Sequence, residues 1–355
     1  MPNELSARYR RLPPLTREIL PARAGHKPQL RVVSARMDVA GYLGQSHVLL
    51  VVGKGGVGKT TVTAALAETA AGAGLSTLVV ALDDSGGLPG LLGHSAPFGY
   101  DRVELGERLS ARTLTSDAAL LEYLDDHGMK RVSKRLVNTG VLDVIATAIP
   151  GIREVLVLGK LKQLERERAA DLILLDAPAT GHAVTFLTSA GGLVDAARGG
   201  PLRSQAEDVV AMLRDPLRCQ VVLVTIPEET PVNEAIETAY RVEDDIGVAL
   251  GPVVVNACYP VLDEIAVDPL DAAAAAGVPP PSSDELADLR GAARFRRSRQ
   301  NLQAAQLGRL ADELPLPQLR LPYLFGAEVG PDGVAELSGA LAAQIPELPP
   351  LAALR

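Results

Sequence analysis

The sequence predicts an α/β protein built on a mostly parallel, doubly wound sheet with an inserted α-helical subdomain. Short, continuous apolar runs recur along the chain, and alanine-rich helical stretches separate most of them. Continuous apolar runs are typical of strands covered on both faces, and their alternation with helices implies right-handed β-α-β crossovers. A glycine-rich stretch, VVGKGGVGKTTV at Val51–Val62, joins the first apolar run to the first helical stretch.

Each expected element follows from such a run. The expected strands are His47–Val52, Thr77–Leu82, Asp171–Asp176, Cys219–Ile226, Pro252–Ala257 and Gln318–Pro322. About ninety residues separate the second strand from the third, far more than one crossover needs. The sequence of that gap favours helices, so we expect the inserted α-helical subdomain there. The expected helices are Thr60–Ala71 and, within the gap, Ser116–Asp126, Lys130–Ile145 and Ile152–Arg168.

The chain divides into three parts. We expect a basic, partly flexible extension at 1–46, with eight Arg and Lys against three Asp and Glu. A core at 47–335 holds the helical insertion at about 88–168 and a second helical and loop region at about 262–315. A C-terminal helix and tail occupy 336–355.

Composition excludes several classes of protein. A net charge of −8 argues against non-specific nucleic-acid binding, which depends on neutralising phosphates. Cys219 and Cys258 are too few for a disulfide framework or a self-contained zinc site. The chain has no apolar run of membrane-spanning length and no secretory signal, so we expect a cytoplasmic protein. The basic run at 290–299 favours a solvated helix face or a subunit contact over a nucleic-acid site.

The stretch GKGGVGKT at Gly53–Thr60 matches the phosphate-loop pattern G-x-x-x-x-G-K-[ST] between a strand and a helix. Glycines let the backbone wrap a phosphate, and the helix that follows directs unpaired N–H groups at the anion. The pattern therefore predicts a P-loop NTPase that binds ATP and Mg²⁺. Lys59 would reach the β- and γ-phosphates, Thr60 would ligate Mg²⁺, and Thr61 would bond the α-phosphate.

Lys54 is a second lysine in the same loop. The chain uses Arg wherever a generic cation suffices, with 28 Arg and 7 Lys among its 35 basic residues. Lys54 is therefore either a solvated surface residue or a compact ammonium needed where a planar guanidinium would not fit.

Candidate site residues also lie at or after the ends of two later strands, Asp171–Asp176 and Pro252–Ala257. Asp176 ends an apolar strand, where a carboxylate is costly unless it has a role at a Mg²⁺ site or as a cap. Gly181 can bring its N–H to a γ-phosphate, and His182 is either a switch residue or a buried structural histidine. Asn256 lies where open α/β sheets bind ligands, or simply ends its strand.

These motifs together resemble one family. KGGVGKTT resembles the deviant phosphate loop of the MinD/ParA/ArsA ATPases, and LILLDAPATGHAVTFL at Leu172–Leu187 is similar to the second switch of the ArsA and tail-anchored-protein-targeting ATPases. The usual D-T-A-P-T-G-H is D-A-P-A-T-G-H here, with the proline one place earlier. The segments at 150–162 and 197–213 look most like the paired ArsA-like anion-transporting ATPases of some bacteria.

The resemblance implies roles for the site residues. Lys54 would cross a dimer interface to the partner's nucleotide. Asp83 would orient the attacking water, although the first switch departs from the family pattern and Asp84 is the alternative. Asp83 and Asp176 would contact Mg²⁺ through water, and Asn256 and Pro322 would bind the adenine. The expected nucleotide-binding residues are Gly53, Gly55, Gly56, Val57, Gly58, Lys59, Thr60, Thr61, Gly181, Asn256 and Pro322, and the expected catalytic residues are Lys54, Lys59, Asp83 and Asp176.

The function implied is a dimeric ATPase switch that couples nucleotide state to a protein client or membrane partner. The dimer would be a homodimer or a heterodimer with a related ArsA-like chain. The alternatives are a targeting factor or chaperone for hydrophobic segments, the energising subunit of an anion pump, a ParA/MinD-type positioning ATPase, and a nucleotide-binding subunit with little turnover. We expect no metalloid site, because the helical insertion contains no cysteine.

Overall fold

The computed structural model describes residues 37–82, 87–126, 128, 151–196, 199–326 and 328–349. Eight strands in these ranges form one sheet, in the order β3-β4-β2-β5-β1-β6-β7-β8. The strands are β1 (Val48–Gly53), β2 (Thr77–Leu82), β3 (Val103–Glu104), β4 (Leu109–Leu114), β5 (Leu172–Ala179), β6 (Cys219–Thr225), β7 (Ala249–Cys258) and β8 (Gln318–Pro322). Neighbouring strands are parallel except for β3 and β4, so the predicted mostly parallel sheet is confirmed.

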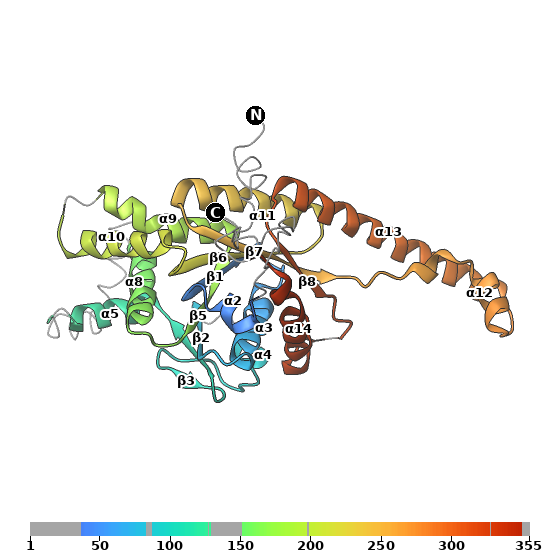
Figure 1. Cartoon of the computed structure of the whole chain (residues 1–355), viewed down its shortest axis with the longest axis horizontal. Helices are drawn as coiled ribbons and strands as arrows, with labels where there is room; N and C mark the ends of the chain where they lie inside the picture. Colours follow the sequence, from blue (N-terminus) through green and yellow to red (C-terminus); the bar gives the residue numbers. More distant parts are fainter. Residues whose placement is uncertain are drawn as a thin grey trace, which may run out of the picture.

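Helices cover both faces of the sheet (Figure 1). One layer contains α8 (Ile152–Arg166), α9 (Thr180–Ala196), α10 (Pro201–Arg214) and α11 (Glu229–Arg241), which continues into the π-helical turn η1 (Val242–Ile246). The other layer contains α2 (Val39–Leu43), α3 (Lys59–Gly72), α4 (Leu88–Leu91), α14 (Pro331–Gln344) and the 3₁₀ turn η3 (Ile345–Glu347). The remaining helices are α5 (Ser116–Asp126), the 3₁₀ turn η2 (Asp263–Ala266), α12 (Pro269–Ala276) and α13 (Ser283–Glu313).

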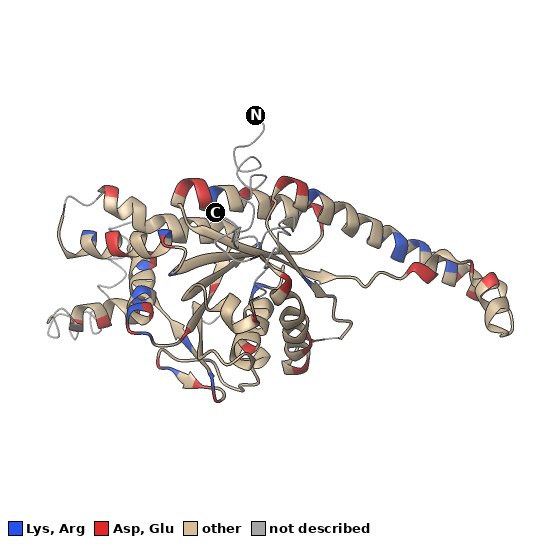
Figure 2. Cartoon of the chain, viewed as in Figure 1, with Lys and Arg blue, Asp and Glu red and all other residues tan. Residues whose placement is uncertain are grey.

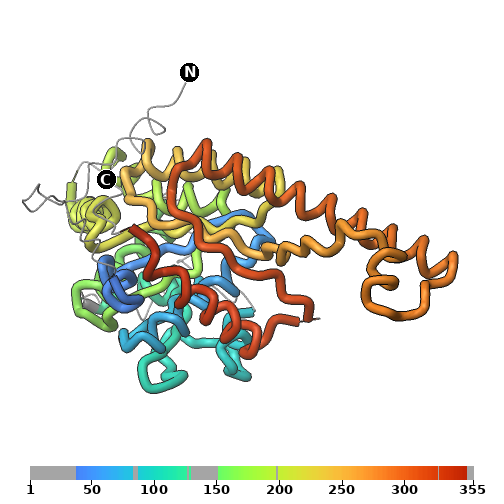
Figure 3. Tube along the Cα trace, turned by 45° about the vertical axis from the view of Figure 1, so that its right-hand side comes forward, coloured from blue at the N-terminus to red at the C-terminus, as the bar shows by residue number. Residues whose placement is uncertain are grey.

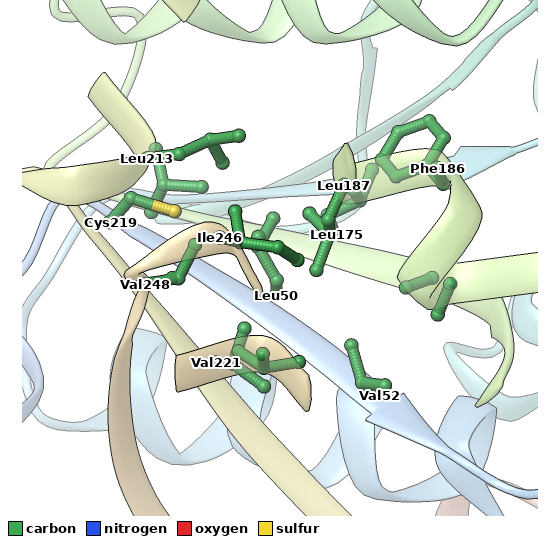
Figure 4. Packing of buried hydrophobic residues seen from close by; sticks show 14 of the residues in the cluster. Leu50, Val52, Leu175, Phe186, Leu187, Leu213, Cys219, Val221, Ile246 and Val248 are labelled. Atoms are coloured by element: carbon green, nitrogen blue, oxygen red, sulfur yellow. The ribbon is translucent and has the colours of Figure 1, made fainter. Parts of the chain in front are cut away.

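The alternation of side chains along β1 divides the core into two halves. Val48, Leu50 and Val52 pack against the α8–α11 layer, and Leu49 and Val51 pack against the α3 layer. Figure 4 shows Leu50 and Val52 beside Leu175, Phe186 and other members of the first half. Because both faces are buried, the central strands need apolar residues at most positions, and this is the pattern in the sequence.

The gap between β2 and β5 is not wholly helical. The structure places β3 and β4 there, and β4 pairs in parallel with β2. The sequence LSARTL of β4 has no continuous apolar run, because Ser110, Arg112 and Thr113 interrupt it. Arg112 is buried under the ring of Tyr100, with 4.6 Å between its guanidinium carbon and the ring centroid. A cation–π contact of this kind allows a charged residue in a buried strand.

The predicted helices α5 and α8 are present, and α8 ends two residues before its predicted end at Arg168. The predicted helix Lys130–Ile145 lies outside the described residues. The end of the predicted basic extension belongs to the core, because α2 buries Tyr42 and Leu43. At the other end of the chain, α14 begins five residues before the predicted tail. Among the described residues, we find no helix that combines the length and the hydropathy needed to cross a membrane.

The connections place a crevice at the carboxyl ends of β1 and β5. The two strands are neighbours, but β1 leads into α3 on one face and β5 leads into α9 on the other. Ligands in open α/β sheets bind at such a topological switch point.

Candidate nucleotide site

The glycine-rich loop lies at this switch point. β1 ends at Gly53 and α3 begins at Lys59, so residues 54–58 form the turn between them. Gly56 and Gly58 both have φ of +87°, a left-handed conformation that residues with a Cβ rarely adopt. The turn can therefore wrap around an anion in front of the first N–H groups of α3.

Two glycines of the loop are also required by close packing. A Cβ at Gly53 would lie 2.3 Å from the carbonyl oxygen of Val224. A Cβ at Gly58 would lie 2.4 Å from Nδ2 of Asn256. The residues present therefore fit a phosphate cradle, and substitution would fill or distort it.

Replacement of Gly58 by Ala should weaken ATP binding by about tenfold or more. The left-handed conformation alone costs an alanine about 1–2 kcal/mol, and the contact with Asn256 adds to that cost. Isothermal titration with a non-hydrolysable ATP analogue measures the affinity. Gly72→Ala at the end of α3 is the control, since a Cβ there meets no atom within 4 Å. Equal affinities for the two variants would contradict the role of Gly58.

Asp176 faces the start of α3. Thr60 Oγ1 donates to Oδ2 of Asp176 at 2.8 Å, and Thr63 Oγ1 approaches Oδ1 at 3.4 Å. Asp176 is only 5% exposed, and burial raises the pKa of its carboxyl above the ordinary value. The hydrogen bonds from the two threonines and the charge of Lys59 act in the opposite direction. Asp176 thus orients the Thr60 hydroxyl, which is the arrangement expected behind a Mg²⁺ ligand.

Lys59 lines one cavity together with Thr60 and Asp176. Its Nζ donates to the carbonyl oxygen of Lys54 at 3.2 Å. Burial lowers the pKa of Lys59, and the negative charge of Asp176 opposes that shift. The cavity has a volume of about 410 Å³. Its polar lining includes Lys59, Thr60, Asp176, Ser116, Arg153 and Glu154.

Lys54 points to a different partner. Its Nζ donates to Oε1 of Glu234 on α11 at 2.5 Å, and the two side chains are about one-third exposed. Thr180 Oγ1, at the first residue of α9, approaches the other oxygen of Glu234 at 3.4 Å. Glu234 therefore links the phosphate loop to the segment that resembles the second switch.

The second-switch segment continues β5 into α9. β5 extends three residues beyond its predicted end, to Ala179, and Gly181 is the second residue of α9. His182 is exposed, so the interpretation as a buried structural histidine is wrong. Thr180 and Gly181 directly follow Ala179, which lines the cavity described above.

Asn256 and Pro322 lie at the carboxyl ends of β7 and β8. Nδ2 of Asn256 donates to the carbonyl oxygen of Val57 at 3.0 Å, so the side chain braces the phosphate loop. Ala257 has φ of +55°. The pairing of β7 with β8 is irregular between Val255 and Cys258, and beyond this irregularity Cys258 pairs with Pro322. Such irregularities in β-strands commonly redirect side chains beside binding sites. Asp83 and Asp84, the candidates for orienting water, lie outside the described residues.

Two residues of the site were missed by sequence reasoning. Arg153, at the start of α8, lines the cavity beside Asp176, and Glu234 holds Lys54. Arg153 lies within the segment at 150–162 that resembles the paired ArsA-like ATPases, whereas Glu234 lies at 224–235, in VTIPEETPVNEA. Arg153 is a charged residue in the first turn of α8 and Glu234 is one of several acidic residues of α11, both common situations, so composition alone could not mark these two.

The fold and the site together define a P-loop nucleotide-binding protein with a second lysine in its phosphate loop. The family model for anion-transporting ATPases matches residues 46–193. ATPase BagA of Mycobacterium tuberculosis is 31% identical over 83% of this chain and 92% of its own. An arsenical pump-driving ATPase of Escherichia coli is 28% identical over 59% of this chain and 34% of its own, and ATPase get3 of Schizosaccharomyces japonicus is 31% identical over 39% and 42%.

The chain therefore belongs to the ArsA-like family of anion-transporting ATPases. This membership confirms the resemblance predicted from the motifs and supports ATPase activity at the level of the family.

Proposed function

We propose that this chain is a Mg²⁺-dependent ATPase switch whose nucleotide sites are completed in a dimer and whose nucleotide state is coupled to a protein partner. The observation that carries the proposal is the position of Lys54. A lysine in the phosphate loop that binds Glu234 outside the cavity does not serve the cavity of its own chain. Because the pair is about one-third exposed, Lys54 can exchange this partner for phosphate on a second chain.

The other residues have separate tasks in this scheme. The loop glycines and the N-terminus of α3 bind the phosphates, and Lys59 balances their charge. Mg²⁺, held by Thr60, would supply charge neutralisation at the β- and γ-phosphate oxygens. Asp176 holds the Thr60 hydroxyl, Asp83 is our candidate for orienting water, and Asn256 and Pro322, at the ends of β7 and β8, are our candidates for binding the base. The pair between Glu234 and Thr180 connects Lys54 to α9, which would transmit the nucleotide state.

The experiment that tests the proposal measures turnover and assembly together. ATP hydrolysis and molar mass by light scattering are recorded with Mg²⁺ and ATP, with ADP, and with the Lys59→Ala chain as the control. We expect hydrolysis, and a dimer stabilised by ATP rather than ADP. ATP-independent mass together with absent hydrolysis would instead support a nucleotide-binding subunit with little turnover.

Replacement of Glu234 by Gln should make ATP-dependent dimerisation more favourable, by up to about fivefold in the ATP concentration required. Gln keeps a hydrogen-bond acceptor but removes the charge that holds Lys54, and partly exposed ion pairs contribute about 0.2–1 kcal/mol. The dimer fraction is followed by light scattering during an ATP titration. Glu237→Gln, one turn further along α11 and exposed, is the matched control. Identical titrations would mean that Glu234 does not restrain Lys54.

A further inference from the structure

α8 carries a basic residue at the end that lies on the nucleotide cavity. The helix has four Lys and Arg against two Glu, and Figure 2 shows basic residues along it. Arg153 is the second residue of α8, and it lines the cavity that also contains Lys59 and Thr60. A cation in the first turn of a helix is opposed by the helix dipole, which favours anions there. The stability of α8 alone therefore does not explain why Arg153 is at this position.

The spacing of residues along α8 places Arg153 on the side of the helix that lines the cavity. Val157, one turn further along, lines the same cavity, and residues four apart lie on one side of a helix. Ile152, beside Arg153, is buried in a different cluster with Ala119 and Leu156. Arg153 itself is exposed, as expected for a side chain that extends into an open cavity.

The first turn of α8 is held in place by α9. Gly151, the N-cap of α8, has φ of +80°, and a Cβ there would lie 3.2 Å from Cβ of Ser189. This close approach leaves little room for a larger residue at position 151. On the same helix α9, Phe186 lines the cavity together with Arg153. The position of Arg153 is therefore set by the packing of α8 on the helix that contains the second-switch segment.

The cavity corresponds to the γ-phosphate end of the expected nucleotide. Leu82 lines it and directly precedes Asp83, our candidate for orienting water. Ala179 lines it and lies two residues before Gly181, our candidate for contacting the γ-phosphate. The candidates for binding the base, at the ends of β7 and β8, are not among the described residues that line it. We therefore expect the γ-phosphate between the phosphate loop and the first turn of α8.

The charges in this cavity suit a phosphate group that one lysine does not balance alone. Lys59 and Arg153 are its positively charged lining residues, and Asp176 and Glu154 are its negatively charged ones. Asp176 already accepts from the threonine hydroxyls of α3. A guanidinium is always ionised and can bind two phosphate oxygens at once. In other NTPases, an arginine supplied by the same chain or by a partner stabilises the charge of the transferring phosphoryl group.

From these observations we propose that Arg153 binds the γ-phosphate of ATP held by its own chain, and so distinguishes ATP from ADP. The inference rests on the proposed function, because it requires ATP in this cavity, and it adds a residue to which the family resemblance gave no role. Lys54 and Arg153 then act in different ways. Lys54 is supplied to the nucleotide of the partner, whereas Arg153 contacts the nucleotide of its own chain.

Nucleotide binding to the full-length chain tests this proposal without turnover. Isothermal titration in the presence of Mg²⁺ compares a non-hydrolysable ATP analogue with ADP. Arg153→Ala should weaken binding of the analogue by about tenfold or more, as expected for a lost hydrogen bond to a charged group, and should leave the affinity for ADP within about twofold of wild type. Arg153→Lys should recover part of the loss, because it keeps the charge but not the planar fork.

Two outcomes of the titration would overturn the proposal. One is an affinity for the analogue that Arg153→Ala leaves unchanged, and the other is an equal loss of affinity for the analogue and for ADP. A missing ATP-dependent dimer would count against the proposed function, but it would not remove the difference between ATP and ADP. The two proposals can therefore fail separately.

Arg294→Ala is the control for the loss of one positive charge. Arg294 is exposed and belongs to the basic run on α13, which projects from the side of the molecule opposite α8 (Figures 1 and 3). The affinities of this variant for both nucleotides should match wild type. Thermal unfolding of Arg153→Ala should also match wild type, because substitution of an exposed side chain changes stability little.

Mixtures of impaired chains test whether Arg153 acts within its own chain. Arg153→Ala mixed with Lys59→Ala should not regain turnover, because each phosphate cradle lacks one of its own cations. Arg153→Ala mixed with Lys54→Ala should regain it, because the cradle of the Lys54→Ala chain is intact and receives Lys54 from the partner. Recovery of the first mixture would show that Arg153 acts on the partner's nucleotide and would overturn the proposal. If neither mixture recovers, the proposed dimer fails, and the difference between ATP and ADP decides the role of Arg153.

Discussion

Replacement of Lys54 by Ala should lower the rate of ATP turnover by about 10³-fold while leaving ATP affinity nearly unchanged. Cationic groups supplied across an interface to a transferring phosphoryl group contribute about 10³- to 10⁵-fold. Lys54 does not line the cavity that holds Lys59 and Thr60, so its loss should spare binding within its own chain. Turnover is measured by phosphate release, and affinity by titration with a non-hydrolysable analogue.

A mixture of two inactive chains tests whether Lys54 acts in trans. The Lys54→Ala chain keeps its own phosphate cradle, and the Lys59→Ala chain keeps Lys54. In a mixed dimer, the phosphate cradle of the Lys54→Ala chain receives Lys54 from the Lys59→Ala chain, so one of the two nucleotide sites is complete. Turnover should therefore reappear on mixing, at a fraction of the wild-type rate. A Lys54→Ala chain with normal turnover, or a mixture that stays inactive although mixed dimers form, would place Lys54 outside the reaction.

The Lys54→Arg variant tests whether the positive charge of Lys54 is sufficient or whether the shape of its ammonium group also matters. An arginine keeps the positive charge, but its planar guanidinium is larger than an ammonium and binds with a fixed fork geometry. The chain uses Arg for most of its cations, yet has Lys at this position. We therefore expect Lys54→Arg to resemble Lys54→Ala rather than wild type.

The fold was largely predictable because the central strands are buried on both faces. Their continuous apolar runs located β1, β2, β6 and β8 to within one residue at each end. β4 was missed because its burial depends on a distant contact between Arg112 and Tyr100. The periodicity of apolar residues cannot predict that contact, because Tyr100 lies twelve residues before Arg112 in a segment without regular structure.

The site was predictable where its chemistry requires special residue types. The glycines of the phosphate loop and the carboxylate of Asp176 are residue types that are unusual in or next to a strand or helix, so they could be recognised in the sequence. The structure places Lys59, Thr60 and Asp176 together. The partner of Lys54 was not predictable, because Glu234 is 180 residues away and is an ordinary acidic residue of an amphipathic helix. Asn256 shows a further limit, since the sequence located it but not its hydrogen bond to Val57.

Replacement of Asp176 by Asn should lower ATP turnover by about 10- to 100-fold, the usual cost of removing a group that orients a metal ligand. Thr60 and Thr63 approach different oxygens of Asp176, and Asn replaces one of these oxygens by an NH₂ group that cannot accept, so one threonine loses its acceptor at this side chain. The loss should be greatest at low Mg²⁺ concentration, and the dependence of turnover on Mg²⁺ measures it. A variant whose Mg²⁺ dependence matches wild type would show that Asp176 does not act through Thr60.

The same substitution should leave the folded chain equally or more stable at pH 7. Burial raises the pKa of Asp176 in the folded state, so its ionised form is disfavoured there, and this cost disappears as the pH falls through the raised pKa. Asp171, immediately before β5, provides a control of opposite sign. Hydrogen bonds from Ser76 lower the pKa of Asp171, so its carboxylate stabilises the fold at neutral pH and this stabilisation is lost in acid.

Thermal unfolding at pH 7 and at successively lower pH distinguishes the two aspartates. Asp176→Asn should match or exceed wild type at pH 7, and its advantage should shrink as the pH falls. Asp171→Asn should be less stable than wild type at pH 7, and its deficit should also shrink in acid. If both variants lose stability at pH 7, then Asp176 stabilises the fold and its burial is no evidence of a role in phosphate chemistry. Opposite signs for Asp171, just before β5, and Asp176, within it, would show that Asp176 is retained for function at a cost in stability.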